Sequence, residues 1–102
     1  MQSPYNAQTS VITTTGGQLQ TYDITTATVI KGAPGRIFRV NVLVAGSTVG
    51  TVNDCLTTGA AAIANQVAAI PDTVGPVVLE WPCATGIVVV PGTGQTLSVS
   101  YV

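Results

Sequence analysis

The stretch that decides the fold runs from Arg36 to Ala45 and has the sequence RIFRVNVLVA. Most of its residues are apolar, and several are β-branched, which suits a pleated strand. Four of them alternate and are expected to point to one face of a sheet: Phe38, Val40, Val42 and Val44. Arg36 and Asn41 interrupt the apolar run, so we expect the opposite face to be partly in contact with water, although Ile37 and Leu43 disturb the alternation.

Glycine and proline residues bound this strand and recur along the chain. Gly32-Ala33-Pro34-Gly35 precedes it and Gly46-Ser47 follows it, and both are typical of turns. Between such turns the sequence predicts further strands over residues 9–15, 18–24, 28–31, 48–53, 77–81, 86–90 and 96–102. The run over 86–90 is apolar throughout after its glycine, which is typical of a strand buried on both faces. The last strand alternates cleanly, with inward Leu97, Val99 and Tyr101 and outward Thr96, Ser98 and Ser100.

Residues 56–70 have a different character from the rest of the chain. The segment Ala60–Ala64 has high helix propensity. Ile63, Val67 and Ile70 have the spacing of one helical face. We therefore predict one short helix near residues 58–65; the alternative is an alanine-rich loop followed by a strand over 66–70.

Short strands separated by glycine and proline turns indicate an all-β protein. We expect a compact β-sandwich of the jelly-roll or Greek-key kind, with about eight short strands. Residues 9–102 are expected to form this single domain. Residues 1–8 are expected to form an irregular N-terminal arm, since Pro4 and Asn6 break regular structure. Tyr5 is the only large anchor of the arm and a candidate for contacts with a neighbouring molecule.

The composition points to a surface that is poor in charge. Hydrophobic residues make up 46% of the 102 residues and charged residues only 7%, whereas about 25% is usual. Such a surface is weakly protected against association and suits a subunit packed against neighbours. With three basic residues and a net charge of −1, tight nucleic-acid binding and electrostatic attachment to a membrane are not expected. The sequence begins without a signal-peptide pattern, so we expect folding in a cytoplasm.

The residues needed for catalysis are sparse. The chain contains no histidine, and each carboxylate stands alone in its local sequence: Asp23, Asp54, Asp72 and Glu80. Aspartates in turns commonly accept hydrogen bonds from nearby backbone amides, which is our interpretation of Asp54 and Asp72. We predict a protein without enzymatic activity, cofactor or metal.

The two cysteines, Cys55 and Cys83, are too far apart for a CxxC motif, and no partner residues complete a zinc site. Two alternatives remain: a pair of buried free thiols, or one disulfide formed after release into an oxidising environment. Both cysteines follow turn-like residues, which is consistent with a meeting of two loops.

The largest and the positively charged side chains are candidate contact residues. Trp81, the only tryptophan, is interpreted as a core residue, and the alternative is an exposed platform for stacking on a sugar. Arg36 and Arg39 are three residues apart, which places them on opposite faces of a regular strand and argues against one basic patch. Both are interface candidates, and we expect at least one to pair with an acidic residue at a subunit contact.

Several motifs resemble those of small virion proteins of tailed bacteriophages. They comprise residues 31–40 (KGAPGRIFRV), 44–47 (VAGS), 52–55 (VNDC) and 81–95 (WPCATGIVVVPGTGQ). The chain from about residue 28 onward is similar to capsid decoration (cement) proteins and to head-fibre or tail-tip modules. This resemblance implies many copies per particle, a homotrimer, and no catalytic residues.

The leading hypothesis is a capsid decoration protein that is made in the host cytoplasm and stabilises the shell in the virion. Its partners would be the major capsid protein or other virion subunits, with the arm adding a strand to, or wrapping around, a neighbour. One alternative is a receptor- or glycan-binding fibre or tail-tip module, which predicts an exposed aromatic such as Trp81 or Tyr22. A third option is a head-completion protein.

Overall fold

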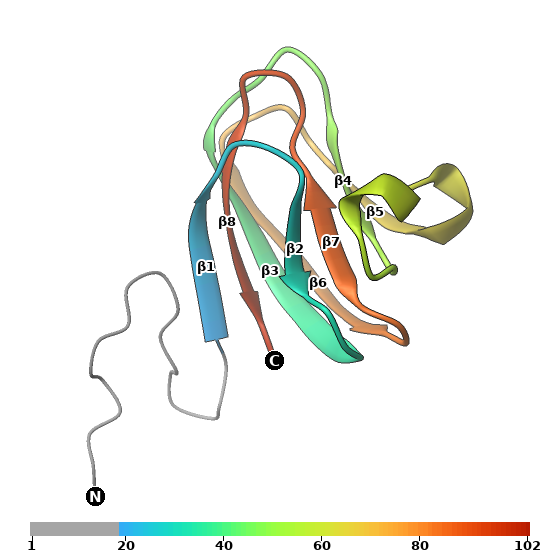
Figure 1. Ribbon diagram of the computed structural model, residues 1–102. Coiled ribbons are helices and arrows are strands. Elements are labelled where there is room, and N and C mark those ends of the chain that lie inside the picture. The colour runs from blue at the N-terminus through green and yellow to red at the C-terminus, as the bar shows by residue number, and fades with distance from the viewer. Residues whose placement is uncertain (1–18) are drawn as a thin grey trace, which may run out of the picture.

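The computed structural model describes residues 19–102, and these fold into two antiparallel sheets of four strands each (Figure 1). The strands are β1 (Leu19–Ile24), β2 (Thr28–Lys31), β3 (Gly35–Val44), β4 (Gly50–Asn53), β5 (Gln66–Ile70), β6 (Gly75–Cys83), β7 (Ile87–Val90) and β8 (Thr96–Tyr101). The all-β sandwich is therefore confirmed. The arm of residues 1–8, with Tyr5, and the strand predicted over 9–15 lie outside the described residues.

The strand order is that of a jelly roll. Sheet A has the order β1-β8-β3-β6 and sheet B the order β2-β7-β4-β5. The antiparallel pairs include β1 with β8, β2 with β7, β3 with β6 and β4 with β5. These are the pairs that form when one long hairpin of eight strands wraps around a common core, which is the jelly-roll arrangement.

The core lies between the two sheets and is almost entirely aliphatic. Sheet A contributes Ile37, Val40, Val42, Leu97 and Val99, and sheet B contributes Val52, Ile70, Ile87 and Val89. The alternation predicted for the last strand is confirmed, because Leu97, Val99 and Tyr101 are buried and the residues between them are half-buried. Removal of this apolar surface from water is the main force that holds the sheets together.

The alternation predicted for β3 is wrong at its ends. Ile37, not Phe38, is buried with Val40, and Val44 is exposed. The pairing of β3 with β8 shifts register between Ile37 and Arg39, so β3 carries one additional residue at this point. Such a bulge changes which side chains face inward, and neither the apolar pattern nor the propensity of these residues reveals it.

The predicted helix near residues 58–65 is also wrong. Two single-turn 3-10 helices, η1 (Thr58–Ala60) and η2 (Ile63–Asn65), are followed directly by β5, so the alternative of a loop and a strand is confirmed. A helix of this length is marginal in water. The Asn65 side chain accepts a hydrogen bond from Ala62 N–H and donates one to Ala60 O, and these bonds favour the observed form together with the pairing of β5 with β4.

Strand β6 extends past both prolines that were expected to bound it, Pro76 and Pro82. Both fit because β6 is an edge strand, where one side needs no backbone hydrogen bonds. No helical segment within residues 19–102 has the length and hydrophobicity needed to cross a bilayer.

Candidate interaction surface

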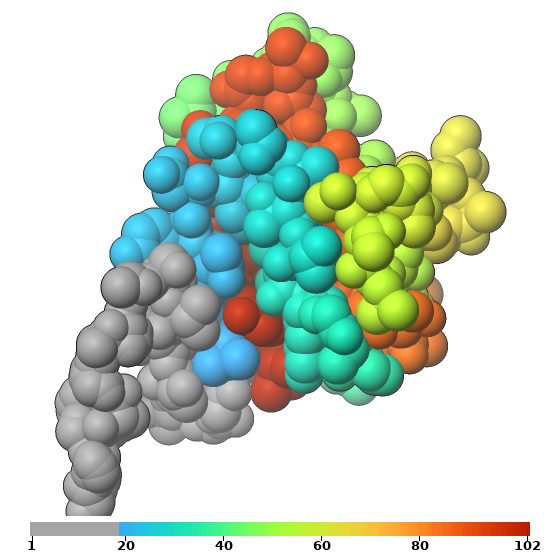
Figure 2. Space-filling view, in the orientation of Figure 1, coloured from blue at the N-terminus to red at the C-terminus, as the bar shows by residue number. Residues whose placement is uncertain are grey.

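The outer face of sheet B is partly covered by the connection between β4 and β5, residues 54–65. Val88 points away from the core, on the side of β7 opposite Ile87 and Val89, yet it is fully buried. This confirms the prediction that the 86–90 strand is buried on both faces. Figure 2 shows residues 54–65, in yellow-green, as a mass beside β2, in teal.

Polar hydrogen bonds attach this covering segment to the sheet. The buried Asn53 donates from Nδ2 to Ala62 O and to Asn65 Oδ1, both at 3.0 Å, and its Oδ1 accepts from Thr51 Oγ1 at 2.8 Å. Asn65 Nδ2 donates to Ala60 O at 2.9 Å. The two asparagines therefore satisfy backbone groups that a loop would otherwise leave without partners.

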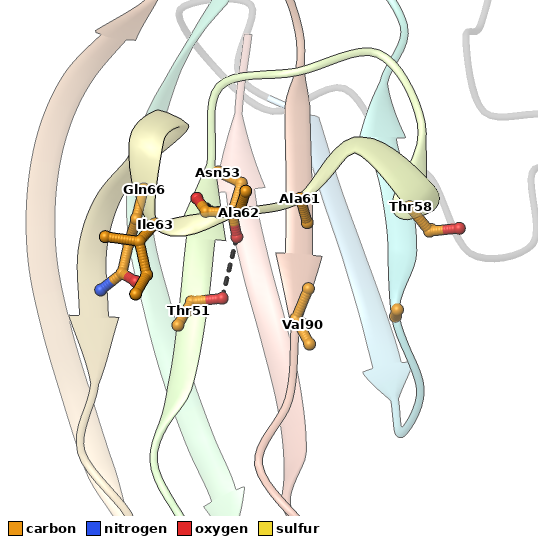
Figure 3. A pocket seen from close by; sticks show the side chains of 9 residues that line it. Thr51, Asn53, Thr58, Ala61, Ala62, Ile63, Gln66 and Val90 are labelled. Atoms are coloured by element: carbon orange, nitrogen blue, oxygen red, sulfur yellow. Dashed lines mark hydrogen bonds between the residues drawn. The ribbon is translucent and has the colours of Figure 1, made fainter.

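A pocket of about 320 Å³ lies between the covering segment and strands β4 and β7 (Figure 3). Its lining is apolar or uncharged, with Ala61, Ala62, Ile63 and Val90 among its residues. Asn53 is the buried polar group in this lining, and its amide is already occupied by the hydrogen bonds described above. The pocket therefore offers space for a small apolar group and no chemistry that could transform it.

A polar clamp joins two loops at one end of the sandwich. The Asp54 carboxylate accepts hydrogen bonds from the backbone N–H groups of Ala84 (2.8 Å), Thr85 (2.7 Å) and Gly86 (3.2 Å). The meeting of two loops is confirmed, whereas our interpretation of Asp54 as a local turn acceptor is wrong. Partial burial raises the pKa of Asp54, but the three backbone hydrogen bonds outweigh it and hold the pKa below its usual value.

The two cysteines lie on either side of this clamp, and both are free and buried. Cys55 Sγ donates to Thr57 O at 3.4 Å. Burial raises the pKa of Cys83 to about 11, with further contributions from the nearby Asp54 and Cys55. The loops approach so closely that a Cβ on Gly86 would clash with the carbonyl oxygen of Cys55. The disulfide stays a prediction.

The outer face of sheet A, by contrast, has no buried residue. Its outward positions on β3 and β8 are exposed or half-buried: Arg36, Arg39, Asn41, Ser98 and Ser100. We call this surface the open face. Within residues 19–102, none of the covering that hides Val88 on sheet B is found here.

Both arginines belong to the open face, and the prediction that they lie on opposite faces is wrong. The bulge between Ile37 and Arg39 changes the alternation, so two residues three apart in sequence point to the same side. Arg36 Nη1 donates to Glu80 O at 3.2 Å. Within the described residues neither arginine forms an ion pair, so the expected acidic partner at a subunit contact stays a prediction.

Large apolar side chains are exposed on the same sheet as the arginines. Val78, opposite Arg39 on β6, is 58% exposed, and Leu43 and Tyr22 are about half exposed. Trp81 is 49% exposed, so its interpretation as a core residue is wrong. The flanking Glu80 and Pro82 are residues typical of an exposed edge strand, and they were the signal in the sequence for the exposure of Trp81.

The edges of sheet A are poorly suited to adding another strand. β6 contains Pro76 and Pro82, and Glu80 has a φ of 49° at a shift in the β3–β6 register. β1 has a similar irregularity at Asp23, with a φ of 60°. Prolines and bulges remove the regular row of free backbone groups that strand addition requires. Contacts of sheet A with another molecule are therefore expected to use side chains on its face.

Among residues 19–102, no group of three or more His, Cys, Asp or Glu side chains could hold a metal ion. The chain matches no protein-family model, no curated protein and no solved structure. Inference about function therefore rests on the surfaces described above.

Proposed function

We propose that this protein is a non-enzymatic structural subunit of a phage virion, specifically a capsid decoration protein that stabilises the shell by contacting neighbouring subunits. The observation that carries the proposal is the open face, which combines exposed aliphatic side chains with two arginines that form no ion pair within residues 19–102. Its support from the fold is general, because jelly rolls occur in viral capsid proteins and also in lectin domains.

The proposed mechanism is burial of the open face across a junction between shell subunits. The covered side of the sandwich, where Asn53 and Asn65 hold the covering segment, would keep the scaffold rigid. Rigid partners lose little conformational entropy on association, so more of the contact free energy stabilises the shell. We further propose that the protein acts as a homotrimer, with residues 1–8 engaging a neighbour.

Copy number tests this proposal most directly. Quantitative mass spectrometry of purified virus particles that carry this chain should give a number of copies comparable to that of the major shell subunit. A few copies per particle would overturn the decoration proposal in favour of a fibre or tail position. Deletion of residues 1–8 should weaken attachment while leaving thermal unfolding of the domain unchanged, and unweakened attachment would overturn the role of the arm.

One observation favours a second candidate, a receptor- or glycan-binding module. Trp81 is half exposed on an edge strand, as a stacking platform for a sugar ring requires. Its fluorescence should then be quenched by acrylamide and protected by an oligosaccharide that binds. A tryptophan shielded from the quencher in the free protein, or one that no glycan of a broad array protects, would exclude the stacking role.

A further inference from the structure

We infer that the open face of sheet A docks onto a carboxylate-rich protein surface of a neighbouring shell subunit, with Arg39 at the centre of the contact. This inference rests on the proposed function and adds to it the surface that binds and the charge of the partner.

Arg39 has small or exposed side chains as its neighbours within the open face. It lies on β3, an inner strand of the sheet, opposite Ser100 on β8 and Val78 on β6. Serine is too small to shield a guanidinium, and Val78 is itself 58% exposed. Arg36 lies on the same side and already donates one hydrogen bond to Glu80 O, which leaves most of its N–H donors available. Two guanidinium groups are thus presented together.

Neither arginine of the open face forms an ion pair with an acidic side chain in the described part of the chain. Of the four acidic residues, Asp54 is held by three backbone amides at one end of the sandwich, and Asp72 lies in the β5–β6 turn. Asp23 and Glu80 occupy the bulges on the two edge strands. Within residues 19–102 none of them pairs with Arg36 or Arg39. Covering these arginines without supplying an anion would be costly, so a partner that buries them must bring carboxylates.

A protein fits this face better than other anionic partners do. Two clustered cations neutralise too few phosphates for tight binding to nucleic acid, and too few lipid headgroups for stable membrane attachment. The same face carries Val78, Leu43 and Tyr22, each about half exposed or more. A combination of arginine, aromatic and aliphatic side chains is typical of protein–protein interfaces.

The partner is expected to contact the face of sheet A and not its edges. The prolines and bulges at the edges of sheet A disfavour strand addition, so the partner meets the face through side chains. Binding should then depend on the identity of outward residues of β3 and should weaken as salt screens the charges.

The test compares two variants with the same change in charge, Arg39→Glu and Lys31→Glu. Lys31, on β2 of sheet B, is the third basic residue and lies outside the open face. Particles of the virus prepared without this protein are the probe, and co-sedimentation measures binding at several salt concentrations. We expect Arg39→Glu to bind at least about tenfold more weakly, Lys31→Glu to remain within about twofold of the unaltered protein, and binding of the unaltered protein to weaken with salt.

Thermal unfolding of both variants verifies that they are folded, and Arg39→Gln serves as a milder second variant. Equal binding by the unaltered protein, Arg39→Glu and Arg39→Gln would overturn the inference and leave the proposed function intact. Equal losses in Arg39→Glu and Lys31→Glu would show a dependence on net charge and also overturn it. Comparable binding to duplex DNA or to phosphatidylserine vesicles would overturn the choice of a protein partner. Failure of the unaltered protein to bind the particles would contradict the proposed function itself.

Discussion

The two outer faces of the sandwich differ although both are formed by four antiparallel strands. On sheet B, residues 54–65 fold back over β7 and bury Val88, and Asn53 holds them there. On sheet A, no outward residue of β3 or β8 is buried, and Arg39 and Val78 are exposed side by side. Among residues 19–102, the long β4–β5 connection thus covers the outer face of one sheet and leaves that of the other uncovered.

The difference shows how a chain with few charges can separate stability from interaction. Residues under the covering segment contribute to the stability of the fold. Residues of the open face contribute little to it, so their identity can suit contact with another molecule. Equivalent substitutions on the two faces should therefore have unequal effects on unfolding, and the following predictions use that contrast.

The largest effect is expected from Asn53→Ala compared with Asn41→Ala on the open face. Loss of the Asn53 amide leaves Ala62 O without this donor and releases the covering segment, which should reduce the free energy of unfolding by about 3 kcal/mol. Asn41 is exposed, so its replacement should cost less than about 0.5 kcal/mol. Urea denaturation measures both, and equal costs would contradict a structural difference between the faces.

The same contrast applies to apolar side chains. Val88→Ala removes two buried methyl groups and should destabilise the fold by about 2 kcal/mol. Val78→Ala changes an exposed side chain and should leave the unfolding midpoint almost unchanged. Thermal unfolding of the pair sharpens the comparison, and a small effect at Val88 would mean that the covering segment opens readily.

A smaller, pH-dependent effect is expected at the Asp54 clamp. Because the folded-state pKa of Asp54 is lowered, its charged form stabilises the fold at every pH above the unfolded-state pKa. That stability is lost as the pH falls from about 4 through the folded-state pKa. Asp54→Asn should cost about 1 kcal/mol at pH 7, allowing for solvent screening, and should flatten the acid limb of the stability curve. Asp72→Asn is the control, and an unchanged acid limb in Asp54→Asn would refute the role of the clamp.

The smallest effect on stability is expected for a Cys55→Ser variant, in which the thiol of Cys83 should differ greatly in reactivity between the folded and the unfolded protein. In a Cys55→Ser variant, Cys83 is the only thiol. Burial, the largest cause of its raised pKa, is retained in this variant, so little thiolate is expected at pH 8. Ellman's reagent should react at least about tenfold faster with the protein in guanidinium than with the folded protein, because the thiolate is the reactive form. Equal rates at pH 8 would indicate that the loop end of the sandwich is not closed around Cys83.

Local patterns in the sequence were sufficient to predict the sandwich, the alternation of β8 and the burial of β7 on both faces. They failed where pairing between distant strands decides the outcome. The bulge in β3 is set by its register with β8, so Arg36 and Arg39 were predicted on opposite faces. The propensity of Ala60–Ala64 for helix is overridden by hydrogen bonds from Asn53 and Asn65, whose spacing alone carries no such signal.

The acidic bulges at the two edges of sheet A have a consequence for the chain before it meets any partner. A protein with only 7% charged residues is at risk of fibril growth when many copies accumulate in one cell. Asp23 and Glu80 each hold a backbone conformation that a regular fibril strand cannot adopt, and each adds a negative charge. The edges of sheet A are therefore expected to resist edge-to-edge association of copies into insoluble filaments, while the open face of the same sheet stays exposed.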